Sequence, residues 1–163
     1  MDGNPMSAET PAAIDIRRVG VIGAGQMGNG IAHVCSLSGY DVVLTDVKPE
    51  QLAKAIQTIE RNMDRQVKRS ILADAERNAA LARIKTSPSI ADLKDCDIVI
   101  EAATENEQVK REILKTLTPI LKKGAIIATN TSSISVTRLA AATDRPEKFI
   151  GMHFMNPVPM MEL

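Results

Sequence analysis

Short apolar runs alternate along the chain with longer stretches whose apolar positions recur at helical spacing. The short runs are typical of strands, and the longer stretches are typical of amphipathic helices. The expected strands cover residues 17–22, 41–46, 97–101, 125–129 and 149–154, with a further short one before Pro88. The expected helices cover residues 27–37, 72–84 and 109–117, one that begins at Pro49 and a short one from Ser135 through Ala142. This alternation predicts an α/β protein with a mostly parallel sheet and helices on both faces.

The segment between the second and third expected strands is long for a connection. Leu52 and Ile59 belong to an apolar stripe at helical spacing, which the polar stretch 61–70 interrupts. A second helical pattern follows at residues 72–84. We therefore expect a helical insertion after the second strand, in the form of a helical hairpin that stands off the sheet.

The length of 163 residues predicts one domain preceded by a short tail. Residues 1–15 have little to bury and are expected to form a flexible leader, and residues 16–163 are expected to form the domain. Twenty Lys and Arg balance twenty Asp and Glu, so we expect neither nucleic acid nor a membrane surface as a partner. The apolar runs are also far shorter than the ~18 residues that a membrane span needs.

The two cysteines, Cys35 and Cys96, are too few for a disulfide framework and lack the spacing of metal ligands. We expect no metal site, and we interpret both cysteines and His33 as structural. The start of the chain lacks the basic and apolar regions of a signal peptide, so the expected location is cytoplasmic.

A glycine-rich turn joins the first expected strand to the first expected helix. It matches the pattern G-x-G-x-x-G in the context that this motif requires. In this motif the first glycine permits a tight turn, the second lets the backbone approach a pyrophosphate, and the third lets the helix pack on the strand. The free N–H groups and the dipole of the helix start favour phosphate. The candidate cofactor-binding residues here are Gly23, Gly25, Gln26, Met27 and Gly28.

Asp46 ends the second expected strand, close to the ~20 residues beyond the motif at which a ribose-binding acid is expected. A carboxylate there accepts hydrogen bonds from both ribose hydroxyls and repels a 2′-phosphate. The sequence therefore predicts NAD rather than NADP, bound to a fold of the Rossmann type. The alternative is that the glycines form only a strand-to-helix turn and that Asp46 only ends a strand.

Three segments of the second half carry a more specific pattern. They are residues 99–106 (VIEAATEN), 129–133 (TNTSS) and 151–159 (GMHFMNPVP). With these segments the chain resembles the L-3-hydroxyacyl-CoA dehydrogenase family and, within it, the bacterial 3-hydroxybutyryl-CoA dehydrogenases. The resemblance extends from about residue 17 to residue 163.

The resemblance implies NAD-dependent oxidation of a (3S)-3-hydroxyacyl-CoA, such as 3-hydroxybutyryl-CoA, to the 3-ketoacyl-CoA. His153 is the implied general acid and base, which suits an imidazole because it titrates near neutral pH. Ser132 resembles the family serine that contacts both the substrate oxygen and the nicotinamide, although it could be only a turn residue. Asn156 resembles a cofactor contact, although an Asn before a proline could also be a plain turn residue.

Glu105 and Lys110 match family positions that touch the nicotinamide ribose or stabilise the cofactor pocket. The alternatives are a carboxylate in the first turn of a helix for Glu105 and a solvated helix charge for Lys110. Asn62 and Arg69 match positions near the coenzyme A nucleotide, where a solvated helix face is the alternative.

In the family a helical C-terminal domain follows, mediates homodimer formation and helps to close the substrate cleft. The resemblance implies that this domain and the glutamate paired with the histidine would lie beyond Leu163, so we expect the chain by itself to turn over poorly. Two other functions stay open: another 3-hydroxyacid dehydrogenase of the L-gulonate type, and an NAD-binding module without catalysis.

Overall fold

The structure, a computed structural model, describes residues 13–163, and most of the expected leader lies outside the described residues. Its centre is a six-stranded sheet in the order β3-β2-β1-β4-β5-β6, in which all five neighbouring pairs are parallel. This is the strand order of Rossmann dinucleotide-binding folds, and it confirms the predicted α/β class. The strands are β1 (Arg18–Ile22), β2 (Asp41–Thr45), β3 (Ile84–Ser87), β4 (Ile98–Glu101), β5 (Ile126–Thr129) and β6 (Phe149–Gly151).

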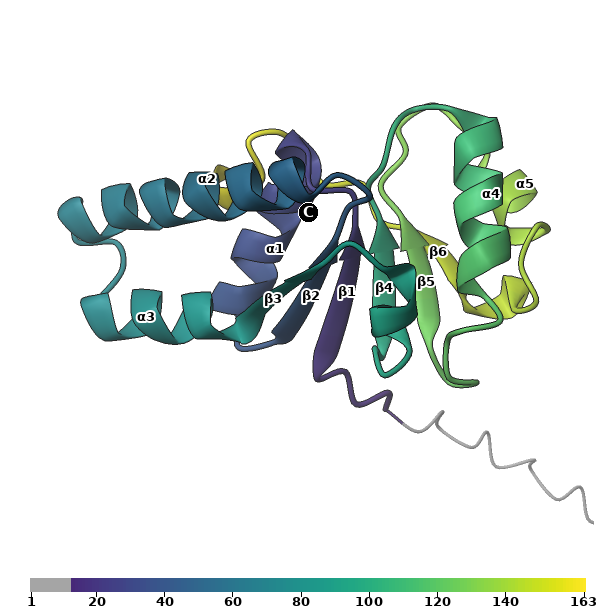
Figure 1. Cartoon of the computed structure of the whole chain (residues 1–163), viewed down its shortest axis with the longest axis horizontal. Coiled ribbons are helices and arrows are strands. Elements are labelled where there is room, and N and C mark those ends of the chain that lie inside the picture. Colours follow the sequence, from purple (N-terminus) through teal and green to yellow (C-terminus); the bar gives the residue numbers. More distant parts are fainter. Residues whose placement is uncertain (1–12) are drawn as a thin grey trace, which may run out of the picture.

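Helices connect the strands and cover both faces of the sheet (Figure 1). Within residues 13–163, no helix combines the length and the apolar character that crossing a membrane requires. The α-helices are α1 (Gln26–Leu37), α2 (Pro49–Lys68), α3 (Asp74–Arg83), α4 (Glu107–Leu117) and α5 (Val136–Ala140). Single 3₁₀ turns occur at Ile90–Leu93, Pro146–Lys148 and Val158–Met160.

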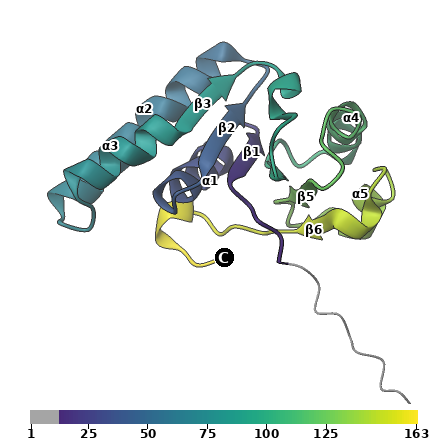
Figure 2. The same cartoon turned by 90° about the horizontal axis from the view of Figure 1, so that it is seen from below.

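Successive side chains of the strands point to opposite faces and build two separate cores. Val19 and Val21 of β1 pack with α1, α2 and α3, whereas Val99 of β4 and Ile127 of β5 pack with α4 and α5. Figure 2 shows α1 and α4 on opposite sides of the sheet. The core is therefore aliphatic on both sides, and the six strands end at one common edge.

The insertion after β2 forms a helical hairpin, α2 and α3, whose far end extends beyond the sheet (Figure 1). The predicted interruption at residues 61–70 is wrong, because α2 runs unbroken to Lys68. Met63 is fully buried and continues the apolar stripe, so the polar residues around it occupy the other faces of the same helix. Arg77 of α3 donates from Nε to Oδ1 of Asp64 at 2.7 Å and joins the two helices.

Candidate nucleotide-binding and active site

The turn from β1 into the first turn of α1 requires glycine at two positions for the fold itself. Gly23 has a φ of 100°, and a Cβ there would lie 2.6 Å from the carbonyl oxygen of Ala102. A Cβ at Gly28 would lie 1.6 Å from the carbonyl oxygen of Gly23. A Cβ at Gly25 would meet nothing within 4 Å. The loop therefore leaves open space at Gly25, where the motif places a pyrophosphate.

The first turn of α1 offers its backbone N–H groups to a ligand. Gly25 is the N-cap and makes no side-chain cap, and the first turn holds no acidic residue. The free N–H groups and the positive end of the helix dipole thus face the open space at Gly25, which suits a phosphate group. This arrangement fits a dinucleotide at the predicted loop.

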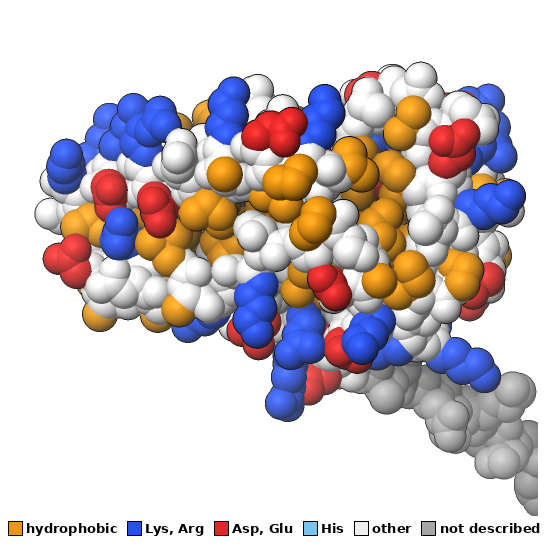
Figure 3. Space-filling view, viewed as in Figure 1, with side chains coloured by type: hydrophobic (Ala, Val, Ile, Leu, Met, Phe, Trp, Pro, Cys, Tyr) orange, Lys and Arg blue, Asp and Glu red, His pale blue; other side chains and the backbone are white. Residues whose placement is uncertain are grey.

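A cleft of about 620 Å³ opens at the carboxyl edge of the sheet, next to the point where the strand order reverses between β1 and β4. Parallel α/β sheets bind their ligands at this position. Figure 3 shows hydrophobic side chains gathered in the hollow between α2 and α4. The cleft is lined by the predicted residues Gly23, Gly25, Gln26, Met27 and Asp46, together with Ile90, Ala102, Ala103, Val109 and others.

Backbone N–H groups fix the carboxylate of Asp46 at the cleft. Ala24 N donates to its Oδ2 and Lys48 N donates to its Oδ1, each at 2.9 Å. The side chain is thereby tied to the glycine loop, beside the space for the dinucleotide. This is where a ribose-binding acid is required.

Lys110 is buried rather than solvated, with 1% of its side chain exposed. Its Nζ donates to Oε1 and Oε2 of Glu101 at 2.7 and 2.8 Å. The alternative of a solvated helix charge is therefore wrong, and this burial does not support a direct contact with a cofactor. Lys110 is connected to the cleft through Glu101, which also accepts a 2.7 Å hydrogen bond from the N–H of Ala103, a residue of the cleft lining.

Sequence reasoning missed Glu101 as part of the site. The carboxylate ends β4, is 1% exposed and also accepts from Thr129 Oγ1 at 2.9 Å. The available signal is the position of Glu101, a charged residue directly after the apolar run 98–100. A buried charge requires a partner of opposite sign, and Lys110 is the residue that provides it.

Glu105 joins the loop after β4 to the loop after β5. Its Oε2 accepts from Thr131 Oγ1 at 2.7 Å and from Ser133 Oγ at 2.9 Å. Partial burial raises the pKa of Glu105, but these hydrogen bonds and the charge of Lys110 outweigh it and lower the pKa overall. The expected place in the first helical turn is wrong, because α4 begins at Glu107.

Ser132 and His153 are both exposed, in loops that follow neighbouring strands β5 and β6. Thr131 and Ser133, on either side of Ser132, are held by Glu105. His153 is preceded by Met152, whose N–H donates to the carbonyl oxygen of Thr129 at 2.9 Å. The structure therefore places both predicted catalytic side chains at the same edge of the sheet as the cleft.

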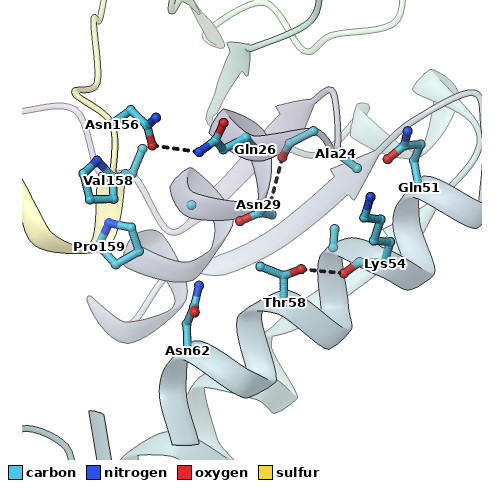
Figure 4. Close-up of a pocket in the computed structure, with 14 residues that line it drawn as sticks. Ala24, Gln26, Asn29, Gln51, Lys54, Thr58, Asn62, Asn156, Val158 and Pro159 are labelled. Atoms are coloured by element: carbon cyan, nitrogen blue, oxygen red, sulfur yellow. Dashed lines mark hydrogen bonds between the residues drawn. The ribbon is translucent and has the colours of Figure 1, made fainter. Parts of the chain in front are cut away.

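Asn156 reaches the glycine loop, where its Oδ1 accepts from Gln26 Nε2 at 3.2 Å (Figure 4). Asn156 and Asn62 line a second pocket, of about 330 Å³, between α1, α2 and the final segment. Figure 4 shows Asn62 on α2, across this pocket from Pro159. Arg69 follows the end of α2 and does not line the pocket, so the structure does not bring the two predicted coenzyme A residues together.

The final segment packs closely on α1 at Gly30, another contact that sequence reasoning missed. A Cβ at Gly30 would lie 2.8 Å from Cβ of Val158. Gly30 follows the motif by two residues, and this additional glycine is the available signal. Together with the bond between Gln26 and Asn156, this contact fixes the path of the residues after His153.

The interpretation of Cys35 and Cys96 as structural agrees with their surroundings. Cys96 is fully buried and Cys35 is half-buried, and both are free thiols. Burial raises the pKa of each thiol to about 11. Neither side chain lines the cleft.

The strand order, the glycine loop and the position of Asp46 define a dinucleotide-binding α/β domain. Residues 18–163 match the family model described as 3-hydroxyacyl-CoA dehydrogenase, NAD binding domain. The chain belongs to this family, and NAD is its cofactor.

Named relatives agree with this assignment. The chain is 58% identical over 148 residues to 3-hydroxybutyryl-CoA dehydrogenase of Bradyrhizobium diazoefficiens, with 91% of the chain and 50% of that protein covered. It is 49% identical over 146 residues to a probable 3-hydroxybutyryl-CoA dehydrogenase of Deinococcus radiodurans, with 90% and 52% covered. The chain thus spans about half the length of these relatives.

A solved structure shares the fold closely. It is (S)-3-hydroxybutyryl-CoA dehydrogenase from Ralstonia eutropha, with a TM-score of 0.89 and 52% identity, and the match covers 91% of the chain and 53% of that protein. A more distant solved structure, a diketoreductase, has a TM-score of 0.82 and 30% identity, with 89% and 52% covered.

Proposed function

We propose that the chain is the NAD-binding part of a dehydrogenase that interconverts (3S)-3-hydroxyacyl-CoA and 3-ketoacyl-CoA thioesters, with 3-hydroxybutyryl-CoA as the favoured substrate. Residues 16–163 form the NAD-binding domain in this proposal. Two relatives whose names state this activity support the choice of substrate.

One structural observation carries the proposal. The segment that holds His153 is bonded on one side to the end of β5, through Met152 and Thr129, and on the other side to the glycine loop, through Asn156 and Gln26. We infer that the imidazole of His153 lies between the loop of Ser132 and the site of the dinucleotide. An acid–base group in that place is what oxidation of an alcohol requires, and cofactor binding alone does not need it.

The chemistry divides between the cofactor and the side chains of the chain. When bound, NAD would supply the acceptor for the hydride that leaves C3 of the substrate. His153 takes the proton of the 3-hydroxyl group, and it returns the proton when the reaction runs in reverse. Ser132 both donates and accepts hydrogen bonds, so its hydroxyl can follow the substrate oxygen from alcohol to ketone.

The coenzyme A end of the substrate lies along α2 in this proposal. Asn62 lines the smaller pocket, and Arg61 and Arg65 lie four residues apart on one face of α2, with Arg69 just beyond the end of the helix. Guanidinium groups suit the phosphates of coenzyme A. We further propose that the protein acts as a homodimer in the cytoplasm.

Cofactor binding is tested by titrating the 163-residue chain with NADH, followed by fluorescence or calorimetry. We expect saturable binding that Asp46→Ala weakens at least about tenfold, because the ribose loses a charged hydrogen-bond acceptor. The control Asp64→Ala, on the far part of α2, should bind NADH as the unchanged chain does. Absence of binding to the unchanged chain would contradict the proposal.

Substrate class is tested on the NADH-bound chain with acetoacetyl-CoA and with free acetoacetate. We expect only the thioester to bind at micromolar concentration and to perturb the imidazole resonance of His153. Preference for the free acid would favour a 3-hydroxyacid dehydrogenase of the L-gulonate type. We also expect slow acetoacetyl-CoA reduction by the chain alone, and a rate equal to that of a full-length relative would contradict this expectation.

A further inference from the structure

The ladder between β5 and β6 continues beyond its last regular pair through a side chain. The regular pairing ends at Thr129 with Gly151, and the N–H of Met152 then donates to the carbonyl oxygen of Thr129. Two residues later, the N–H of Phe154 donates to the side-chain Oδ1 of Asn130 at 2.8 Å. The Asn130 amide thus takes the place of the next main-chain carbonyl, and His153 lies between the two bonded residues.

Asn130 is itself held firmly. Its N–H donates to the carbonyl oxygen of Glu101 at 2.9 Å, and 9% of the residue is exposed. The preceding Thr129 donates from Oγ1 to the carboxylate of Glu101, which is paired with Lys110. The orientation of the Asn130 amide is set by chemistry, because a main-chain N–H can only donate and must face the oxygen.

Few other bonds hold the backbone around His153. Among the described residues, 153–156 make two hydrogen bonds to the rest of the chain: Phe154 with Asn130, and Asn156 with Gln26. The second of these lies three residues beyond His153 and joins two exposed side chains. Together with the bond from Met152 to Thr129, the partly buried Asn130 bond is therefore the restraint nearest to His153.

We propose that Asn130 is a positioning residue that holds His153 in register with the Ser132 loop. The inference rests on the proposed function, in which His153 carries the proton. Asn130 and Ser132 belong to the same loop, so one short segment both supplies a hydroxyl for the substrate oxygen and sets the place of the imidazole. Loss of the amide oxygen leaves the peptide after His153 free to move away from that loop.

The test compares Asn130→Ala, which lacks the acceptor, with Asn130→Asp, which keeps an oxygen at the same position. Asn78→Ala on the exposed face of α3 is the matched control. The chain has two histidines, so its NMR spectrum contains two sets of imidazole signals. The His153 signal reports on the site, and the signal of buried His33 reports on the integrity of α1.

In Asn130→Ala we expect the His153 imidazole signals to shift or broaden, with the His33 signals unchanged. Hydrogen exchange at the amide of Phe154 should become about threefold to tenfold faster, the factor that one net hydrogen bond provides. Asn130→Asp should restore both readouts, and Asn78→Ala should alter neither.

Unchanged His153 signals and unchanged Phe154 exchange in Asn130→Ala would overturn the inference. Loss of the His33 signals together with those of His153 would also overturn it, because Asn130 would then support the whole fold. These readouts use the chain without cofactor, so they remain decisive if the chain fails to bind NADH, a result that would count against the proposed function alone.

Discussion

The Nζ of Lys110 lies 2.7 and 2.8 Å from the two carboxylate oxygens of Glu101, and each side chain is 1% exposed. Hydrogen bonds from Ala103 and Thr129 occupy the remaining positions around the carboxylate. The pair joins α4 to the ends of β4 and β5 beneath the cleft. A buried ion pair is tolerated when all of its hydrogen bonds are made. Removing one partner leaves the other charge buried without compensation, which is strongly destabilising.

We expect Lys110→Met to lower the free energy of unfolding by about 3–5 kcal/mol, because the Glu101 charge stays buried without its partner. The double variant Lys110→Met, Glu101→Gln should lose clearly less free energy of unfolding than the two single variants lose when their losses are added. Urea unfolding measures both quantities. Arg111→Met breaks a partly exposed pair with Glu107 on the same helix and should lower the free energy of unfolding by about 1 kcal/mol or less. If Lys110→Met and Arg111→Met lower the free energy of unfolding equally, burial does not make the Lys110 pair more important for stability.

Substitutions at the glycines of the motif should distinguish positions that the fold requires from positions that only the cofactor requires. Gly25→Ala adds a methyl group in open space, at a φ of −71° that alanine adopts freely, so stability should be unchanged or slightly higher. The same methyl group occupies the space for the pyrophosphate, so the affinity for NADH should fall at least about tenfold. Thermal unfolding and NADH titration measure the two effects.

Gly28→Ala is the matched comparison within the same motif. Its methyl group would overlap the carbonyl oxygen of Gly23, so this variant should lose stability as well as NADH binding. If Gly28→Ala and Gly25→Ala unfold at the same temperature, the distinction between structural and cofactor-binding glycines is wrong.

Asp46 should determine the choice between the two nicotinamide dinucleotides. Its carboxylate is fixed by two backbone N–H groups, so it cannot turn away from a 2′-phosphate without losing both bonds. The unchanged chain should therefore bind NADH much more tightly than NADPH, and Asp46→Ala should narrow the ratio of the two affinities at least about tenfold. Calorimetry with both cofactors measures the ratio, and an unaltered ratio would exclude Asp46 as its cause.

His33 should make the fold sensitive to acid. Its Nε2 lies 3.0 Å from Oε1 of Gln66, while its buried Nδ1 has no hydrogen-bond partner among the described residues. Burial lowers the pKa of His33 below 6.5, against the opposing effect of the Gln66 hydrogen bond. Below pH 6.5 the unfolded chain therefore binds more protons than the folded one, and stability falls as the pH is lowered toward the folded-state pKa.

The variant His33→Gln cannot titrate and should lose stability less steeply below pH 6.5. Urea unfolding across this pH range measures the difference in slope. Parallel curves for His33→Gln and the unchanged chain would show that His33 contributes nothing to the dependence.

Much of the fold could be predicted from the sequence because apolar periodicity and glycine positions act locally. The strand run ending at Ile22, the loop at Gly23 and Gly28 and the cap at Ser135 all follow from neighbouring residues. The strand order and the burial of Lys110 could not be derived in this way, because they depend on which segments meet in space. A lysine at helical spacing looks the same in sequence whether it faces solvent or a buried carboxylate.

The site shows the same division between local and distant effects. Asp46 was predictable from its spacing to the motif, whereas Asn130 holds Phe154 across 24 residues and leaves no mark in the local pattern. The interruption expected at residues 61–70 failed because buried Met63 lies among charged neighbours on a long helix. Met63 and Val67 are four residues apart, so the apolar face of the helix continues through the polar stretch.

The contact between Gly30 and Val158 has a consequence for biosynthesis. The helix that carries the cofactor loop is made early, but the residue that covers its glycine is added more than a hundred residues later. At a translation rate of about 5–20 residues per second, that surface of the emerging chain stays uncovered for about 6 to 26 seconds. The face of α1 at Gly30 can therefore close only after almost the whole chain has been made.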